Sequence, residues 1–263
     1  MDVVLMEVED RVAILTLNRP DRLNAWTPEM EARYFELLEE CAADPDVRAI
    51  VVTGAGKGFC AGADMGSLQQ IGEAGGIGEH RPRAQRFATT IPKPIVAAIN
   101  GACAGIGLVH ALYCDVRFAA SDAKFTTAFA RRGLVAEHGM SWTLPRLVGH
   151  ARALDLLMSG RVFLGDEAAQ LGVVNAAFAG NEVLDKTLAY ASDLAENCSP
   201  AAMAAMKRQV NADWTRELPD AIETANALMV ESLGADDFRE GVASFMEKRP
   251  PRFAPVGGEV HAA

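Results

Sequence analysis

The chain has 263 residues, of which 50% are hydrophobic and 23% are charged, and its formal net charge is −10. This composition is typical of a soluble globular protein with a sizeable core, and the acidic balance argues against nucleic acid as the main partner. The five cysteines are widely spaced without a C-x-x-C pair, which favours buried thiols in a reducing compartment over a disulfide framework or a zinc site. The chain shows neither an apolar run long enough for a membrane span nor the pattern of a signal peptide. We therefore expect a cytoplasmic protein that acts away from membranes.

The first 53 residues predict two strands, a helix and a third strand. Val3–Val8 and Val12–Leu17 are aliphatic runs separated by three polar residues, a pattern typical of a hairpin. Thr27 is followed by proline and acidic residues, so we expect it to cap the start of a helix. Apolar residues at helical spacing give this helix one buried face: Met30, Tyr34, Leu37, Leu38 and Cys41. Val47–Thr53 predicts a buried strand.

Two segments share the order of a strand, a turn and a run of small residues. Ile50–Gly66 reads IVVTGAGKGFCAGADMG, and Ile95–Leu108 reads IVAAINGACAGIGL. Small residues allow the backbone to come close to a ligand. Because two such turns can aim backbone N–H groups at one oxygen, the pair is compatible with an oxyanion hole built without side chains. Each segment taken singly is equally compatible with a structural strand–turn–helix connection.

The rest of the chain alternates short strands with helices and then becomes helical. We expect a mobile loop over Leu68–Glu79 and a helix over Ile106–Tyr113, and mostly helices from Gly139 onward. Further strands are expected over Val116–Ala119, Lys124–Thr127 and Val173–Phe178. This order predicts an α/β core over residues 1–198, a helical extension over 199–253 that packs on the core or on a neighbouring subunit, and a tail over 254–263.

Several short motifs accompany the two small-residue segments. They are Leu17-Asn18-Arg19-Pro20, Ile91-Pro92-Lys93-Pro94, Cys114-Asp115, Gly133-Leu134-Val135, Leu144-Pro145-Arg146-Leu147 and Phe245-Met246-Glu247-Lys248-Arg249. In their order and spacing, the motifs resemble those of the enoyl-CoA hydratase/isomerase (crotonase) superfamily. The resemblance implies the ClpP/crotonase fold, in which repeated ββα units form two roughly perpendicular sheets. It also implies a homotrimer or a hexamer (a dimer of trimers) assembled through the C-terminal helices.

The resemblance further implies that the thioester carbonyl of an acyl-CoA lies between two backbone N–H groups. By position these groups belong to Ala63, within Ala61-Gly62-Ala63-Asp64, and to Ile106, within Ala104-Gly105-Ile106-Gly107. Removal of a proton beside a thioester gives an enolate, whose charge moves onto that oxygen, and one aimed N–H donor is worth roughly 3 kcal/mol. Ile106 stands where the family often has glycine, and its β-branched side chain is expected to narrow the pocket.

The acid–base positions depart from the hydratase pattern. Hydratases of the family use two glutamates to activate a water, and those positions fall on Val109 and Phe129, which cannot move a proton. Glu137 stands where several family members carry a working carboxylate, so the resemblance assigns proton transfer on the acyl chain to Glu137. Two alternatives stay open. Glu137 could instead cap the helix that follows Gly139, and the neighbouring His138 could tune or replace Glu137.

For the CoA portion, the resemblance implies contacts near the end of the first hairpin and along the Ala61–Asp64 turn. The residues at these places are Arg22, Leu23, Ala25, Ala61, Asp64 and Met65. Lys248, in the C-terminal motif, is expected to approach the nucleotide end. Coenzyme A is then part of the substrate, so we expect no separate cofactor, and the chain shows no metal-ligand spacing.

One carboxylate and two missing glutamates favour enoyl-CoA isomerisation, because a single base can carry out both proton transfers of that reaction. Hydration of a 2-enoyl-CoA by Glu137, alone or with His138, is the first alternative, and thioester hydrolysis is a second. A protein that binds acyl-CoA without catalysis is the alternative of a different class. The sequence leaves the acyl group unspecified.

Overall fold

The computed structural model describes residues 2–74 and 83–256, and it begins with the expected hairpin. Strands β1 (Val4–Glu9) and β2 (Val12–Leu17) pair antiparallel through a two-residue turn whose residues both have positive φ. Helix α1 (Pro28–Ala43) follows, and the side chain of Thr27 caps it by accepting a hydrogen bond from the N–H of Met30 at 3.2 Å. All five predicted apolar residues of this helix are buried, so the helical periodicity is confirmed.

The larger of two sheets has the strand order β1-β2-β3-β5-β7-β10. Every neighbouring pair is parallel apart from β1–β2. The added strands are β3 (Ala49–Gly54), β5 (Ile95–Ile99), β7 (Val116–Ala120) and β10 (Ala176–Phe178). Every residue of β3 and β5 is buried, which explains why these segments read as continuous apolar runs rather than alternating ones.

The smaller sheet has the order β4-β6-β8-β9. Its strands are β4 (Gly58–Cys60), β6 (Ala102–Ala104), β8 (Lys124–Thr126) and β9 (Phe163–Leu164). The pairs β3–β4, β5–β6 and β7–β8 each give one strand to the large sheet and one to the small sheet, and a helix follows each pair. The expected repetition of ββα units is therefore present, with the described residues forming a mixed α/β fold.

Glycines occupy the points where the chain passes from the large sheet to the small one. A Cβ atom on Gly54 would lie 2.1 Å from the carbonyl oxygen of Gly58, and one on Gly101 would lie 2.1 Å from that of Lys57. Both contacts are with backbone, which cannot move aside without breaking the strand pairing. The two glycines therefore allow the close crossing that sets up the ββα repeat.

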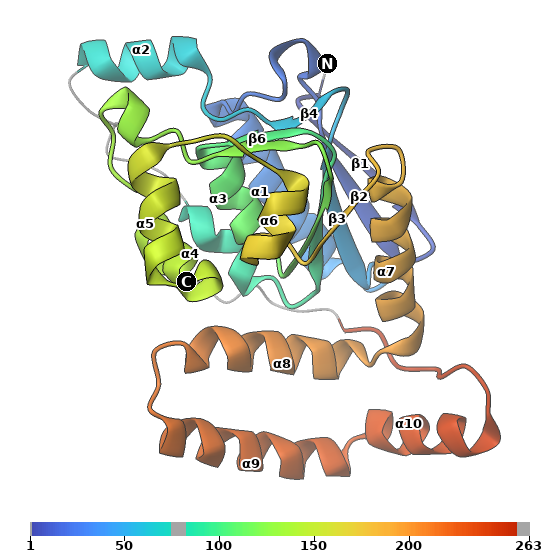
Figure 1. Ribbon diagram of the computed structural model, residues 1–263. Helices are drawn as coiled ribbons and strands as arrows, with labels where there is room; N and C mark the ends of the chain where they lie inside the picture. Colours follow the sequence, from blue (N-terminus) through green and yellow to red (C-terminus); the bar gives the residue numbers. More distant parts are fainter. Residues whose placement is uncertain (1, 75–82, 257–263) are drawn as a thin grey trace.

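Helices cover the sheets on several sides (Figure 1). They are α3 (Ile106–Leu112), α4 (Met140–Val148), α5 (His150–Ser159), α6 (Gly165–Leu171) and α7 (Val183–Asn197), with 3₁₀ turns η1 (Pro20–Arg22), η2 (Gln85–Thr90) and η3 (Ala130–Arg132). Helix α2 (Met65–Ala74) projects away from the sheets. Helix α7 packs on one face of the large sheet, where its Ala191 and Ala195 join a small buried cluster with β2, β3 and β5. Helix α1 packs on β1 and β2, against the main core.

Helix α2 replaces most of the mobile loop that the sequence predicts over Leu68–Glu79. The side chain of Asp64 accepts a hydrogen bond from the N–H of Gly66 at 3.0 Å, and its carbonyl accepts one from Leu68 at 3.0 Å, so the helix has a capped start. Glycine lowers helix propensity by about 1 kcal/mol, which is why the composition suggests a loop. The prediction is wrong for residues 68–74, and residues 75–79 lie outside the described part of the chain.

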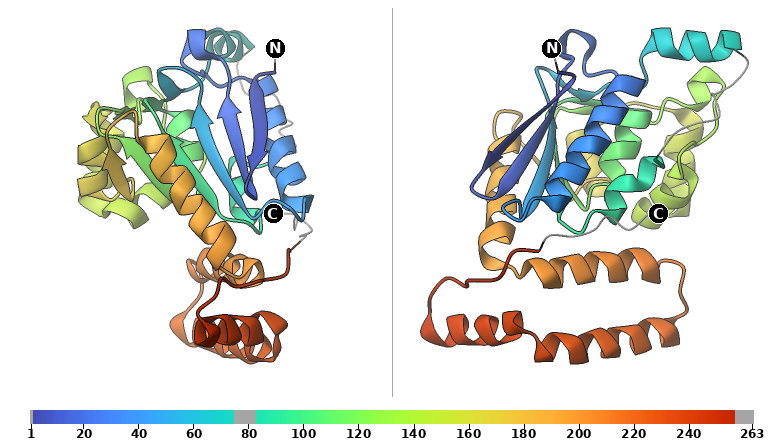
Figure 2. Two further views of the ribbon diagram at one scale, coloured as in Figure 1. Left: turned by 90° about the vertical axis from the view of Figure 1, so that its right-hand side faces the viewer. Right: turned by 180° about the vertical axis from the view of Figure 1, so that it is seen from behind.

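The last three helices are α8 (Pro200–Asp213), α9 (Leu218–Gly234) and α10 (Asp236–Glu247), and Figures 1 and 2 show them as a layer beyond the core. Lys207 fastens α8 to the core, because its Nζ lies 2.7 Å from an Asp115 carboxylate oxygen and donates to the carbonyl of Lys93 at 3.0 Å. Helix α9 has no buried residue. Across the described residues, no helix combines the length and the apolar character that crossing a membrane requires.

Candidate active site

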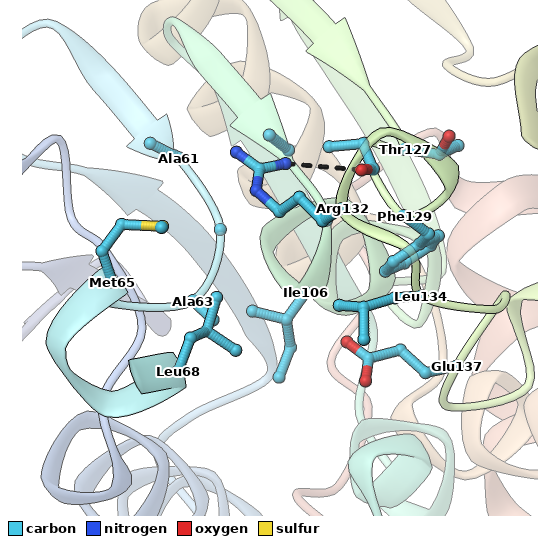
Figure 3. A pocket seen from close by; sticks show the side chains of 14 residues that line it. Ala61, Ala63, Met65, Leu68, Ile106, Thr127, Phe129, Arg132, Leu134 and Glu137 are labelled. Atoms are coloured by element: carbon cyan, nitrogen blue, oxygen red, sulfur yellow. Dashed lines mark hydrogen bonds between the residues drawn. The ribbon is translucent and has the colours of Figure 1, made fainter. Parts of the chain in front are cut away.

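A pocket lies where the two small-residue segments meet the chain between β8 and α4 (Figure 3). It encloses about 420 Å³ of space, part of which is open to solvent. The residues that line it include Ala63, Ile106, Phe129, Arg132, Leu134 and Glu137. The structure therefore brings all three predicted catalytic residues to one pocket, although they are up to 74 positions apart in the chain (137 − 63).

The N–H group of Ala63 is directed away from the neighbouring chain segment at Trp26. Ala63 forms an isolated parallel bridge with Trp26, in which Trp26 donates to the carbonyl of Gly62 at 2.8 Å and accepts from the N–H of Asp64 at 2.9 Å. In a parallel bridge of this kind, Trp26 bonds to the residues on either side of Ala63 and not to Ala63 itself. The N–H of Ala63 therefore points to the side away from Trp26. Since Ala63 lines the pocket, its backbone donor is available for a bound group.

Ile106 supplies the second backbone donor. It is the first residue of α3, and the first N–H groups of a helix have no acceptor within that helix. Gly105 precedes it with φ 49° and ψ −122°, a conformation that essentially requires glycine. Within the described part of the chain, neither Ala63 nor Ile106 donates a backbone hydrogen bond. Both donors are therefore unsatisfied at the pocket.

The small residues of the two turns also serve the contact between them. Strands β4 and β6 pair Cys60 with Cys103, and a Cβ atom on Gly107 would lie 2.3 Å from the carbonyl oxygen of Cys60. Gly62 has φ 105°, and a Cβ there would lie 3.2 Å from the carbonyl oxygen of Ala104. The structural interpretation of these segments is therefore confirmed, and the same close backbone packing fixes the positions of the two N–H groups that the functional interpretation needs.

The predicted CoA-binding residues Arg22, Leu23 and Ala25 lie in a segment that borders the Ala61–Asp64 turn. Asn24 is fully buried and donates to the carbonyls of Ala55 at 3.0 Å and Gly58 at 2.7 Å. The carbonyl of Leu23 accepts from the N–H of Ala61 at 3.0 Å. These bonds hold the end of the hairpin beside the Ala61–Asp64 turn, as the resemblance implies. Whether these residues bind CoA stays a prediction.

Of the other predicted CoA contacts, Met65 and Asp64 lie at or beside the pocket, and Lys248 lies far from it. Met65 is 64% exposed and lines the pocket. Asp64 forms an ion pair with Arg19 at 3.0 Å, and the hydrogen bond from Arg19 is the main cause that lowers the pKa of Asp64. Lys248 follows α10, which lies on the side of the molecule opposite α2 in Figure 1, so the structure does not bring Lys248 to this pocket of its own chain.

Glu137 lies in the irregular segment before α4. Its side chain is 34% exposed, and Figure 3 shows the carboxylate directed into the pocket near Ile106 and Leu134. One carboxylate oxygen lies 3.5 Å from Nε2 of His138. The start of α4 has Gly139 at its N-cap and no hydrogen bond from a capping side chain. The helix-capping alternative for Glu137 is therefore wrong, and the carboxylate is left to face the pocket.

The two hydratase positions contribute no acid to the pocket. Phe129 forms part of its wall, and Val109 is buried in the core on α3. Trp142, near the start of α4, packs outside the pocket with its ring centroid 4.7 Å from that of Trp214. It is 38% exposed. The apolar surroundings of Glu137 are thus provided by Phe129 and Leu134 rather than by Val109 and Trp142.

Arg132 is a pocket residue that the sequence did not single out. Figure 3 places its guanidinium near Ala61, at the end of the pocket opposite Glu137. It donates to the carbonyl of Ala128 at 3.4 Å and forms no ion pair with any described residue. In the sequence, Arg131-Arg132 looks like an ordinary solvated pair of charges. Only the fold shows that one of the two arginines faces the site.

This arrangement suits chemistry on a carbonyl compound. Two backbone donors can stabilise negative charge on an oxygen, and a carboxylate in the same pocket can remove or return a proton nearby. Among the described residues, no three His, Cys, Asp or Glu side chains gather as a metal site would require.

Comparisons with known proteins agree with this chemistry. The model of the enoyl-CoA hydratase/isomerase family matches residues 7–255. The 1,2-epoxyphenylacetyl-CoA isomerase of Escherichia coli (strain K12) is 35% identical, with 96% of this chain and 98% of that protein covered. Among solved structures, a probable enoyl-CoA hydratase/isomerase from Mycobacterium abscessus superposes with a TM-score of 0.89 at 31% identity, covering 96% of this chain and 99% of that one. An enoyl-CoA hydratase from Mycobacterium marinum is 51% identical with a TM-score of 0.71, covering 82% of this chain and all of that one. The match along nearly the whole chain and the shared fold show that this protein is an enzyme of the enoyl-CoA hydratase/isomerase family, the crotonase superfamily.

Proposed function

We propose that this enzyme isomerises an enoyl-CoA thioester, with Glu137 as the proton-transfer group and the N–H groups of Ala63 and Ile106 as the oxyanion hole. The observation that carries the proposal is the meeting of these three residues in one pocket, while Val109 and Phe129 occupy the positions of the hydratase glutamates. A site with one carboxylate is suited to moving a proton, whereas the family's hydratases use two to hold a water.

The reaction balances with one base. The Glu137 carboxylate removes a proton from C2 of a 3-enoyl-CoA, and the electrons of that C–H bond pass through the thioester to its oxygen. The two backbone donors stabilise the resulting dienolate. Glu137 then returns the proton to C4, which leaves the double bond between C2 and C3, conjugated with the thioester. Neither an external acid nor a water molecule is consumed.

Hydration of a 2-enoyl-CoA is the second candidate, and one observation favours it. Nε2 of His138 lies 3.5 Å from a carboxylate oxygen of Glu137, so both groups could hydrogen-bond to one water lying beside them. The relatives divide in the same way, because the protein from E. coli carries the name of an isomerase and that from M. marinum the name of a hydratase.

A paired spectrophotometric assay separates these functions. The purified protein is offered a 3-enoyl-CoA and, separately, a 2-enoyl-CoA, and the absorbance of the conjugated thioester is followed. We expect a gain of absorbance from the 3-enoyl ester that Glu137→Gln abolishes. Glu29→Gln, which alters an exposed glutamate in the first turn of α1, is the matched control and should leave the rate unchanged.

Each of the other outcomes would contradict the proposal and identify a different function or a different role for Glu137. Loss of absorbance from the 2-enoyl ester would instead identify a hydratase. Activity that survives in Glu137→Gln would overturn the role of Glu137 in either reaction. If neither ester reacts, thioester hydrolysis, followed as release of the CoA thiol, or binding of acyl-CoA without turnover would replace the proposal.

The proposal includes a cytoplasmic homotrimer or hexamer. Helix α9 supports the assembly, because apolar residues along it are at least half exposed: Leu218, Ile222, Met229, Val230 and Leu233. A stripe of this kind is typical of a helix that packs against another subunit. Light scattering coupled to gel filtration should give three or six times the chain mass of 28.0 kDa, and a monomer would contradict this part.

A further inference from the structure

The segment that carries Glu137 is held from behind by a phenol hydroxyl. Tyr113 Oη donates a hydrogen bond to the backbone carbonyl of His138 at 2.5 Å, across 25 residues of chain. Tyr113 is half-buried and follows the last residue of α3 directly. This bond therefore connects the end of a buried helix to the residue next to the candidate base.

The backbone at this contact has an uncommon conformation. His138 has φ 51° and Gly139 has φ 75°, so two successive residues lie in the left-handed region. For a residue other than glycine this conformation costs on the order of 1 kcal/mol, and it persists where surrounding contacts hold it. A Cβ atom on Gly139 would lie 2.7 Å from Tyr113 Oη, so glycine is also what leaves room for the hydroxyl.

The same segment is tied to Glu137 through the His138 side chain. Its Nε2 lies 3.5 Å from a carboxylate oxygen of Glu137. The backbone of His138 thus contacts Tyr113, while its ring contacts Glu137. A shift of this residue would move the carboxylate with it.

Helix α3 connects the hydroxyl to the oxyanion hole. Ile106 is its first residue, Tyr113 comes directly after its last, and all seven residues of the helix are buried. A helix of this length spans about 10 Å and behaves as one rigid piece. One end of α3 therefore carries the N–H of Ile106, the proposed oxyanion donor, and the other end holds the segment that carries Glu137.

We propose that Tyr113 is a positioning residue, whose hydroxyl fixes the Glu137–His138 segment relative to the N–H of Ile106. This inference rests on the proposed function, because it assumes that Glu137 moves the proton. Burial raises the pKa of Tyr113 above its ordinary value, so the phenol keeps its proton and stays a donor at neutral pH. In the absence of the hydroxyl, the carboxylate would sample positions away from the carbon that it must reach.

The first test is Tyr113→Phe, which removes only the hydroxyl. We expect kcat to fall about 10- to 100-fold, since displacement of a catalytic group by an ångström costs up to roughly 100-fold. KM should stay close to that of the wild type, because the donors of Ala63 and Ile106 remain. Tyr190→Phe is the matched control. Tyr190 and Tyr113 line the same cleft between the core and α8. Among the described residues, Tyr190 forms no hydrogen bond with the segment that carries Glu137.

The second test approaches the contact from the other side. Gly139→Ala would press its Cβ on Tyr113 Oη, and it should lower kcat in the wild-type background. In the Tyr113→Phe background that clash is absent, so the same substitution should lower kcat by a smaller factor. The backbone strain of alanine at φ 75° is common to both backgrounds and cancels in this comparison.

The outcomes separate this inference from the proposed function. If Glu137→Gln is inactive and Tyr113→Phe has the wild-type kcat, the inference is overturned and the proposed function stands. If Glu137→Gln retains full activity, the proposed function is overturned and the inference with it. A Tyr113→Phe protein with raised KM and a melting temperature well below that of Tyr190→Phe would show a general structural role instead of positioning.

Discussion

The two sides of the pocket are built in different ways. The side proposed as the oxyanion hole is backbone: it is fixed by the pairing of β4 with β6, by the buried Asn24 and by close glycine contacts. The side proposed for proton transfer is a single side chain, one-third exposed, on an irregular segment with positive φ at Gly133, His138 and Gly139.

The difference shows how one scaffold can support several reactions. Backbone N–H donors do not depend on which side chains stand at Ala63 and Ile106. The segment at Glu137 lies outside the sheets, and catalytic side chains are often found on such segments, positioned by a rigid scaffold. In the proposed mechanism the irregular segment would therefore decide the reaction type, and the backbone donors would stabilise the enolate.

The largest expected effect comes from the side-chain half of the pocket. Glu137→Gln should lower kcat by about 10²- to 10⁴-fold, the range for loss of a general acid–base group, with little change in melting temperature. The measurement is steady-state kinetics beside thermal unfolding. A marked loss of stability would contradict the view that this segment is separable from the fold.

The second effect comes from the backbone half. Gly107→Ala should lower kcat by about 10²- to 10³-fold, as for loss of an oxyanion donor, because its Cβ would lie 2.3 Å from the carbonyl of Cys60 and force α3 away from β4. Unlike Glu137→Gln, it should also lower the melting temperature. Gly234→Ala, where an added Cβ meets nothing within 4 Å, is the control. Wild-type activity in Gly107→Ala would contradict the view that close packing at Gly107 fixes the backbone donor of Ile106.

The third effect concerns Arg132, at the end of the pocket opposite Glu137. Arg132→Met should raise KM for an acyl-CoA by about 2- to 5-fold and leave kcat nearly unchanged, since an exposed charge contributes up to roughly 1 kcal/mol. The effect should weaken as salt rises, because salt screens exposed charges. Arg131→Met, at the neighbouring arginine that does not line the pocket, is the control. A fall in kcat at constant KM would place Arg132 with the proton-transfer group instead.

The smallest effect is a dependence of stability on pH at Asp64. The pKa of Asp64 is lowered in the folded protein, mainly by the hydrogen bond from Arg19. The ion pair therefore stabilises the fold fully at pH values above 3.8, the ordinary pKa of this carboxyl. The stabilisation is lost as the pH falls through the lower pKa of the folded protein. At neutral pH, Asp64→Asn should cost up to about 1 kcal/mol in the free energy of unfolding. Urea unfolding at several pH values should show the difference from the wild type shrinking below pH 3.8. A difference that does not vary with pH would contradict a role for the charged carboxylate, because the ion pair with Arg19 and the hydrogen bonds from the start of α2 all favour its ionised form.

Much of the fold follows from local sequence pattern. Strand β2 has the predicted bounds, and α1 begins after the predicted cap. These elements depend on periodicity and on capping side chains within a few residues, so the sequence contains the whole signal. Helix α2 was missed because its glycines argue against a helix, while its start depends on one carboxylate that could equally have faced a ligand.

The chemical groups of the site can be read from the amino-acid sequence: two turns rich in small residues, one carboxylate at Glu137, and apolar residues at Val109 and Phe129. The tertiary structure alone decided which of these groups meet. It placed Glu137 in the pocket with Ala63 and Ile106, added Arg132, left Trp142 outside and set Tyr113 behind His138. The physical reason is that each of these contacts joins segments far apart in the chain, and their closeness comes from the packing of the two sheets and α3 rather than from any local pattern.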